Sequence, residues 1–350
     1  MNRRGYLDWL RGIAVLIMIE AHTLDSWMRL EDRTHPWYGD LMVIAGFGAP
    51  AFLFLAGIAL ALAAGSRQRK GKPDEEVAAL ARRRGWQIFG LAFLFRFQSW
   101  LISGGGLNSL LKVDILNVMG LAMLGGALLW GWGRSRVGRV VCFAAATVAV
   151  AMLTPIVRES AALAPLPDRL EAYLRPIPGR TTFTLFPWAA FLLAGGVVGL
   201  WLDAAQRAGE ELRANLGLLV LGVVVGLAGY GAAQLPSIYA ASSFWTSSPT
   251  FFFIRLGILM AAVPMAYAWC RLPLPSAALE YLGRASLFIY WIHVEIVYGV
   301  LTLPLHRRLP FNETLLAFVL FTGLMFAVAR MKDRLVAAPP PRSAAQTTAT

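Results

Sequence analysis

The chain is poor in cysteine and in charged residues. It has two cysteines, Cys142 and Cys270, in 350 residues, which is too few for a disulfide framework or a cysteine-based metal site. Charged residues make up 15% of the chain and apolar residues 57%, whereas an average soluble domain is about 25% charged. This composition excludes an ordinary soluble globule and indicates a protein that crosses a lipid bilayer several times.

Motifs typical of several other chemistries are absent from the sequence. It has no Walker-type or Rossmann-type glycine motif and no Gly-x-Ser-x-Gly nucleophile motif. Its four histidines lie in separate segments without a His-x-x-x-His pair, so we expect no metal site. A net charge of +12 could suggest a nucleic-acid partner. In a membrane protein, however, surplus lysine and arginine gather beside cytoplasmic helix ends, and we expect no nucleic acid.

Long apolar runs recur along the whole chain instead. A transmembrane helix needs about 20 mostly apolar residues. This length predicts ten spans, over residues 7–28, 40–64, 85–103, 113–132, 138–156, 182–202, 215–233, 250–270, 279–300 and 313–331. Basic residues concentrate in alternate connecting segments, most densely over 67–84, and the positive-inside rule then predicts cytoplasmic N- and C-termini.

The predicted fold is therefore an all-α polytopic membrane protein, a bundle of about ten transmembrane helices. We expect a single domain over residues 1–336 and a disordered cytoplasmic tail over 337–350, which contains three consecutive prolines. Residues 74–84 are predicted to form a short surface helix ahead of the third span.

Arg11 and His22 are the most informative polar residues because both lie inside the first span. Eleven residues of α-helix turn through about 1100° and rise about 16 Å, so the two side chains share one stripe of the helix. Charges inside a span cost about 2.5–3.5 kcal/mol each, and they usually mark a pathway or a reaction centre. Asp8 offers an alternative for Arg11, since residues three positions apart can simply pair.

His35 is a candidate in the loop after the first span. It is followed by Trp37 and Asp40. The tryptophan could roof a sugar-sized site, and the carboxylate could orient an imidazole, as base–orienter pairs require.

Further polar residues occur in later spans. Arg96 and Arg255 lie toward the outer ends of the third and eighth spans, where they could serve a site or snorkel outward. Arg284 begins the ninth span, and Tyr290 and His293 continue it along one polar stripe. Such a stripe faces protein or water, and its spacing leaves open whether it lines a substrate or joins helices.

Several of these segments resemble known membrane acyltransferases. Residues 7–12, with Asp8, Arg11 and Gly12, followed by His22, resemble the opening of enzymes that O-acetylate extracytoplasmic glycans. The order of features more closely resembles the heparan-α-glucosaminide N-acetyltransferase family and its bacterial relatives. These features are Arg-Gly in the first span, a loop histidine, and the segments 52–57, 186–188, 194–196 and 286–293.

The resemblance implies a transmembrane acyltransferase. Such an enzyme takes an acetyl group from cytoplasmic acetyl-CoA and delivers it to an amine or hydroxyl of an extracytoplasmic glycan-type acceptor, with a histidine as base or acyl carrier and no metal. His35 falls at the family's loop histidine. His22 falls where the glucosaminide enzymes can have asparagine and the O-acetylating enzymes have histidine. Which imidazole is the base, and whether the acceptor is an amine or a hydroxyl, therefore stays open.

The predicted site has three groups of residues. The catalytic candidates are His22, His35 and Arg11. The candidates for contacts with acetyl-CoA, whose phosphates need cations, are Arg11, Arg284, Arg84 and Arg96. The candidates for acceptor binding are Trp37, Asp40, Arg255, Tyr290 and His293.

The expected partners are the lipid bilayer, acetyl-CoA and a sugar-like acceptor, and the expected location is the inner cell membrane, as a multi-pass protein. The oligomeric state stays open, with a homodimer included. The alternative is a membrane transporter or flippase whose buried arginine, histidine and glutamate residues form a substrate or proton pathway. The sequence shows no inverted repeat, which counts against that alternative.

Overall fold

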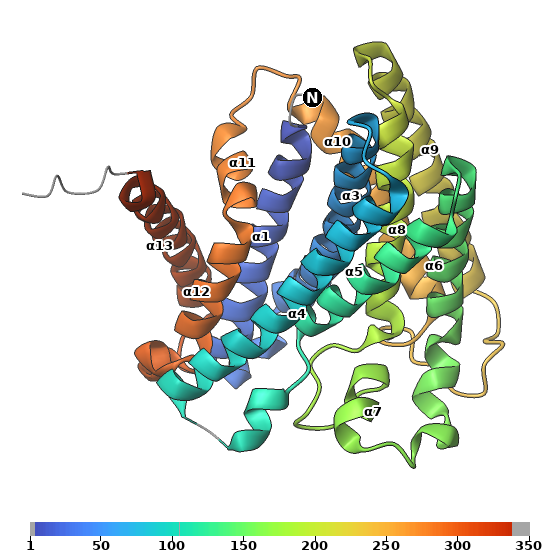
Figure 1. Ribbon diagram of the computed structural model, residues 1–350. Coiled ribbons are helices and arrows are strands. Elements are labelled where there is room, and N and C mark those ends of the chain that lie inside the picture. Colours follow the sequence, from blue (N-terminus) through green and yellow to red (C-terminus); the bar gives the residue numbers. More distant parts are fainter. Residues whose placement is uncertain (1–3, 105, 338–350) are drawn as a thin grey trace, which may run out of the picture.

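Long helices run up and down through the molecule, as Figure 1 shows. The computed structural model describes residues 4–104 and 106–337. In chain order, with short 3-10 turns marked η, the elements are α1 (Gly5–Trp27), η1 (Leu30–Thr34), α2 (Pro36–Ala45), α3 (Gly48–Arg69), α4 (Asp74–Ser103), η2 (Leu107–Leu111), α5 (Ile115–Trp132), α6 (Arg136–Glu159), η3 (Ala161–Leu163), α7 (Asp168–Leu174), α8 (Leu185–Ala204), α9 (Ala208–Ala233), α10 (Pro249–Trp269), α11 (Ala277–Arg284), α12 (Ser286–Tyr298), η4 (Val300–Leu305) and α13 (Phe311–Ala337).

Every predicted span coincides with one helix or with two consecutive helices. The second span is divided into α2 and α3, and the ninth into α11 and α12. In the described part of the chain, seven helical segments are long and apolar enough to cross a membrane, and one of them, Tyr38–Arg69, combines α2 and α3. The helices α1, α4 and α12 fall short because of their polar residues or their length. A multi-pass α-helical membrane protein is thus confirmed, while ten crossings and cytoplasmic termini stay predictions.

Two predictions about individual segments, the surface helix and the C-terminal tail, are not confirmed by the structure. The short surface helix over residues 74–84 is wrong as a separate element, because α4 runs without interruption from Asp74 to Ser103. The stretch that joins the two parts contains one glycine, Gly85, but no proline that would break the helix, and acidic residues in the first turn of α4 favour a helix start there. The predicted tail lies outside the described residues from 338 onward.

The helices approach one another most closely where glycines face backbone. A Cβ atom added to Gly195 of α8 would lie 2.8 Å from the carbonyl carbon of Phe54 in α3. At the crossing of α1 and α11, a Cβ atom added to Gly283 would lie 2.8 Å from the carbonyl carbon of Asp8. Small residues permit this close packing in membrane helices. The second contact fixes the start of α1 against the end of α11.

Candidate functional site

Among the described residues, one large cavity is lined by residues from both ends of the helix bundle. Its volume is about 1460 Å³, and its walls come mainly from α1, α3, α4, α5, α8, α10, α11 and α12. One end lies beside the start of α1, the end of α3 and the start of α4, where the lining residues are Arg11, Arg67, Arg83, Arg84 and Arg284. The opposite end lies beside the end of α1 and the start of α10, where the lining residues include Asp25, Lys112, Arg158, Trp245 and Tyr298.

The arginine end of the cavity, defined by those five arginines, carries uncompensated positive charge. Arg11 pairs with Asp8 (Nη1 to Oδ1, 3.1 Å), so the simple pairing considered for it does occur, although it also lines the cavity. Arg284 lies 3.8 Å from a carboxylate oxygen of Glu280. The other three guanidinium groups have no carboxylate within ion-pair distance among the described residues. Guanidinium groups in such a cluster suit a ligand with several negative charges.

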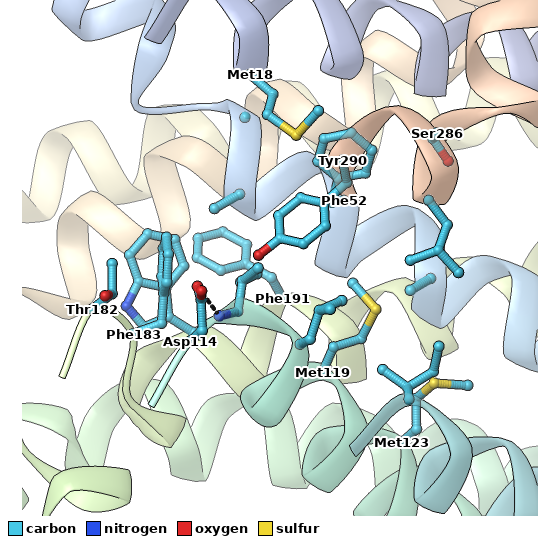
Figure 2. Close-up of a pocket in the computed structure, with 18 of the residues that line it drawn as sticks. Met18, Phe52, Asp114, Met119, Met123, Thr182, Phe183, Phe191, Ser286 and Tyr290 are labelled. Carbon is cyan, nitrogen blue, oxygen red and sulfur yellow. Dashed lines mark hydrogen bonds between the residues drawn. The ribbon is translucent and has the colours of Figure 1, made fainter. Parts of the chain in front are cut away.

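The middle of the cavity is mainly apolar, and Figure 2 shows Met18, Phe52, Met119 and Met123 among the side chains that line it. Such a section suits a slender, uncharged part of a ligand.

One ion pair interrupts this apolar lining. The guanidinium of Arg96 donates to the Asp114 carboxylate at 2.5 Å; Figure 2 shows where Asp114 lies. Asp114 also accepts from the backbone N–H of Ile115 at 2.7 Å and so caps α5. The side chain of Tyr290 is close enough to interact electrostatically with both Asp114 and Arg96. Sequence reasoning missed Asp114, although an acidic residue at the start of an apolar run was a signal that could have indicated it.

His22 lines the cavity toward its second end and contacts a second histidine behind it. The Nδ1 atom of His22 lies 2.8 Å from Nε2 of His293 in α12. The planes of the two rings differ by only 3°, and their centroids are 5.0 Å apart. His293 is completely buried (0% exposed), and its Nδ1 lies 2.8 Å from the carbonyl oxygen of Ile289. His293, predicted to bind the acceptor, is thus placed against His22 and is not among the cavity-lining residues.

At the second end of the cavity, cations lie beside aromatic rings. The guanidinium of Arg255 lies 3.9 Å from the centroid of the Phe251 ring, a favourable cation–π distance. Arg158, Trp188 and Trp245 line the same region. Within the described residues, neither Arg255 nor Arg158 has a carboxylate at ion-pair distance. Such N–H donors beside aromatic faces can hold and orient a polar ligand.

Besides His293, three predicted site residues lie outside the lining of this cavity. His35 caps the start of α2 by accepting from the backbone N–H of Trp37 at 3.3 Å. Its ring stacks on Phe311 with the centroids 3.8 Å apart. The Trp37 side chain is 65% exposed, and Asp40 is also exposed. Among the described residues, no cluster of three potential metal ligands lies together.

The structure therefore collects most, but not all, of the predicted residues at one cavity. The predicted residues that line it are Arg11, His22, Arg84, Arg96, Arg255, Arg284 and Tyr290. Arg96 lies in the middle section, paired with Asp114, and not at the arginine end. A span prediction identifies which helices carry polar residues, and the shared cavity shows that these helices turn the residues toward one another.

Comparison with known proteins agrees with the resemblance. The family described as heparan-alpha-glucosaminide N-acetyltransferase, catalytic, matches residues 3–235. No curated protein matches the chain. The matched part includes Arg11 and His22, whereas α10 to α13 lie beyond it. Because the match covers well over half of the chain, and the chain has the apolar helices of a multi-pass membrane protein, the protein belongs to the heparan-α-glucosaminide N-acetyltransferase catalytic family, a family of membrane acetyltransferases.

Proposed function

We propose that the protein transfers an acetyl group from acetyl-CoA, bound at the arginine end of the cavity, to a glycan-type acceptor that enters from the opposite end. His22 acts as the general base. The observation that carries this proposal is the continuity of one cavity from uncompensated arginines to an imidazole. The helical rise from Arg11 to His22 is about 16 Å, a distance that an extended donor has to cover if its phosphates stay at the arginine end.

The parts of acetyl-CoA match the sections of the cavity in the same order along its length. Arg67, Arg83 and Arg84 can hold the phosphates of the nucleotide part through charge-assisted hydrogen bonds. The slender arm of the cofactor would then run through the apolar middle beside Phe52 and Met119. The thioester would arrive near His22. The positive-inside rule makes the arginine end cytoplasmic, and the membrane we propose is the inner cell membrane.

A thioester is already activated, so the reaction needs little beyond a general base and a hydrogen-bond donor that stabilises the oxyanion of the intermediate. Nε2 of His22 takes the proton of the acceptor O–H or N–H as the acceptor atom bonds to the acetyl carbonyl carbon. The tetrahedral intermediate then collapses, the carbon–sulfur bond breaks, and His22 returns the proton to the leaving thiolate. The products are the acetylated acceptor and CoA with a free thiol. We assign Tyr290, which lines the cavity, as a hydrogen-bond donor to the carbonyl oxygen.

We favour direct transfer through a complex of both substrates over an acyl carrier. A cavity of about 1460 Å³ with chemically different ends has room for donor and acceptor together. We also favour His22 over His35 as the base, because His22 lines this cavity and His35 is engaged as a helix cap.

The test uses the purified full chain in lipid nanodiscs with radiolabelled acetyl-CoA and a panel of glucosamine-type and hydroxyl acceptors. We expect label transfer that falls at least about 100-fold in His22→Ala, in keeping with the loss of a general base. His35→Asn, which keeps a capping oxygen, should lose less than about tenfold, because even complete loss of a cap would cost only about 1 kcal/mol of stability. His306→Asn, at a position that is not among the cavity-lining residues, is the matched control.

Three outcomes would refute the proposal. Full label transfer by His22→Ala would remove the proposed base. Acetyl-histidine that accumulates in the absence of acceptor would replace direct transfer by an acyl carrier. Absence of acetyl-CoA binding, together with acceptor uptake into proteoliposomes, would establish the transporter alternative.

A further inference from the structure

We propose that His293 is a positioning residue that fixes the proton of His22 on Nδ1, so that the lone pair of the His22 ring is on Nε2. The inference rests on the proposed function, in which His22 is the base, and it assigns that base an orienting partner. His293 lies outside the segment that matches the family, residues 3–235. The assignment therefore comes from the geometry of α1 and α12.

The first step concerns the proton on His293. Its Nδ1 lies 2.8 Å from the carbonyl oxygen of Ile289. A carbonyl oxygen can only accept a hydrogen bond, so this nitrogen carries a hydrogen. The ring is fully buried, and no carboxylate lies at ion-pair distance from it among the described residues. An imidazolium would have neither solvent nor a counter-ion there. His293 is therefore neutral, and its Nε2 has a lone pair.

The second step passes this constraint to His22. Its Nδ1 lies 2.8 Å from Nε2 of His293, and two lone pairs cannot face each other at that distance. His22 must therefore donate from Nδ1. The ring planes are nearly parallel, and the centroids are 5.0 Å apart. With the nitrogens so much closer than the centroids, the rings meet edge to edge, which is the alignment that an N–H···N bond requires.

The third step is the consequence for the reaction. A neutral imidazole has one N–H and one lone pair, so with Nδ1 protonated the lone pair of His22 is on Nε2. When Nε2 takes the acceptor proton, the Nδ1–H bond to His293 is already in place to stabilise the cation. A backbone carbonyl and a second imidazole thus perform the orienting role that a carboxylate has in catalytic triads.

The other groups around His22 do not compete for its Nδ1. Asp25, one turn farther along α1, accepts from the hydroxyl of Tyr298 at 2.9 Å. The Tyr298 ring meets His22 edge-on, with centroids 5.4 Å apart. Asp114, the residue that caps α5, is paired with Arg96. These carboxylates are therefore already occupied.

The kinetic test compares two substitutions at position 293 in the full-length protein. His293→Leu removes the acceptor for the His22 proton, and a buried N–H without a partner is costly. His22 should then move its proton to Nε2, and kcat should fall by about 10- to 100-fold, with KM for acetyl-CoA unchanged. His293→Gln offers an amide oxygen to the same N–H and should restore most of kcat. His306→Gln is the control for loss of a histidine.

A spectroscopic test reads the proton directly. The chain has only four histidines, so histidine labelled with 15N gives a small set of signals, and His22→Ala identifies those of residue 22. We expect protonated Nδ1 in the wild type and in His293→Gln, and protonated Nε2 in His293→Leu. Protonated Nε2 in the wild type, or no change in His293→Leu, would overturn the inference.

The two readouts separate this inference from the proposed function. If His22 has the expected proton position but the wild type acetylates no acceptor, the proposed function fails and the catalytic role of His293 fails with it. If acetyl transfer needs His22 but neither kcat nor the proton position depends on residue 293, the inference fails alone.

Discussion

Substitution of Gly283 tests the contact that fixes the arginine end of the cavity. A methyl group at this position would lie 2.8 Å from the carbonyl carbon of Asp8 and 3.0 Å from the backbone nitrogen of Gly12. It would also overlap the carbonyl oxygen of Asp8, which is the nearest atom. Carbon atoms in ordinary contact are about 3.5–4.0 Å apart, so α11 and α1 would have to separate by at least about 1 Å. All three obstacles are backbone atoms, which cannot rotate away as the end of a side chain can.

The expected cost follows from two opposing effects. Overpacking of this kind costs typically about 1–3 kcal/mol, occasionally more, while replacing glycine by alanine within a helix returns up to about 1 kcal/mol. We therefore expect Gly283→Ala to lower the free energy of unfolding by about 2 kcal/mol. Gly323→Ala in α13, where a methyl group meets nothing within 4 Å, has only the helix effect and should be neutral or slightly stabilising.

The substitution should also weaken donor binding, because Arg284 follows directly after the glycine and Arg11 lies on the other side of the contact. The assays are thermal unfolding in detergent and calorimetric titration with acetyl-CoA, for Gly283→Ala and Gly323→Ala in parallel. Equal unfolding temperatures and equal affinities for the two variants would refute the close α1–α11 contact as the support of the arginine end.

Three further predictions concern charged residues. Arg84→Gln should raise KM for acetyl-CoA about tenfold, the value of one charge-assisted contact, and an unchanged KM at low salt would contradict a phosphate role. Arg96→Met leaves the Asp114 carboxylate without its guanidinium and should lower stability by about 3 kcal/mol, measured by thermal unfolding; a loss below about 1 kcal/mol would contradict it. The hydrogen bond from Arg29 lowers the pKa of Asp32 in the folded protein. Its stabilisation is therefore complete above the ordinary pKa of about 3.9 and is lost as the pH falls through the lowered value. Asp32→Asn should accordingly flatten the fall in unfolding temperature below about pH 4, and an unchanged slope would contradict the pairing.

The apolar runs predicted nearly all of the helices because hydropathy depends on local composition alone. The division of two spans was not predictable in this way. The break between α2 and α3 lies at Gly46 and Phe47, and the break between α11 and α12 lies at Ala285. Each spans only a residue or two of apolar or small character, which leaves the average hydropathy of the segment unchanged. Contacts with other helices decide such breaks.

The candidate site was predictable to the extent that polar residues inside spans face a shared interior. This reasoning located Arg11, His22, Arg255 and Tyr290, all of which line the cavity. It could not pair His22 with His293, because the two are 271 positions apart and the rotation of one helix says nothing about the rotation of another.

The loop histidine shows a second limit of sequence reasoning. Its place in the chain fits the family's loop histidine, yet the ring of His35 packs on Phe311 of α13. A motif gives the position of a residue along the chain, whereas the orientation of a loop side chain depends on a helix almost at the other end of the sequence. The catalytic role of His35 stays a prediction, which the variants above test.

The helix α1 makes both of the contacts that position the site. It contacts α11 through Gly12 near its start and contacts α12 through His22 near its end. A helix of this length is rigid, so it holds the arginine end and the base at a constant separation. The segment of α11 and α12 is less constrained, because it bends at Ala285 between the two contacts. Both contacts are therefore needed to keep His293 in register with His22, and widening the first with Gly283→Ala should also lower kcat in the same direction as His293→Leu.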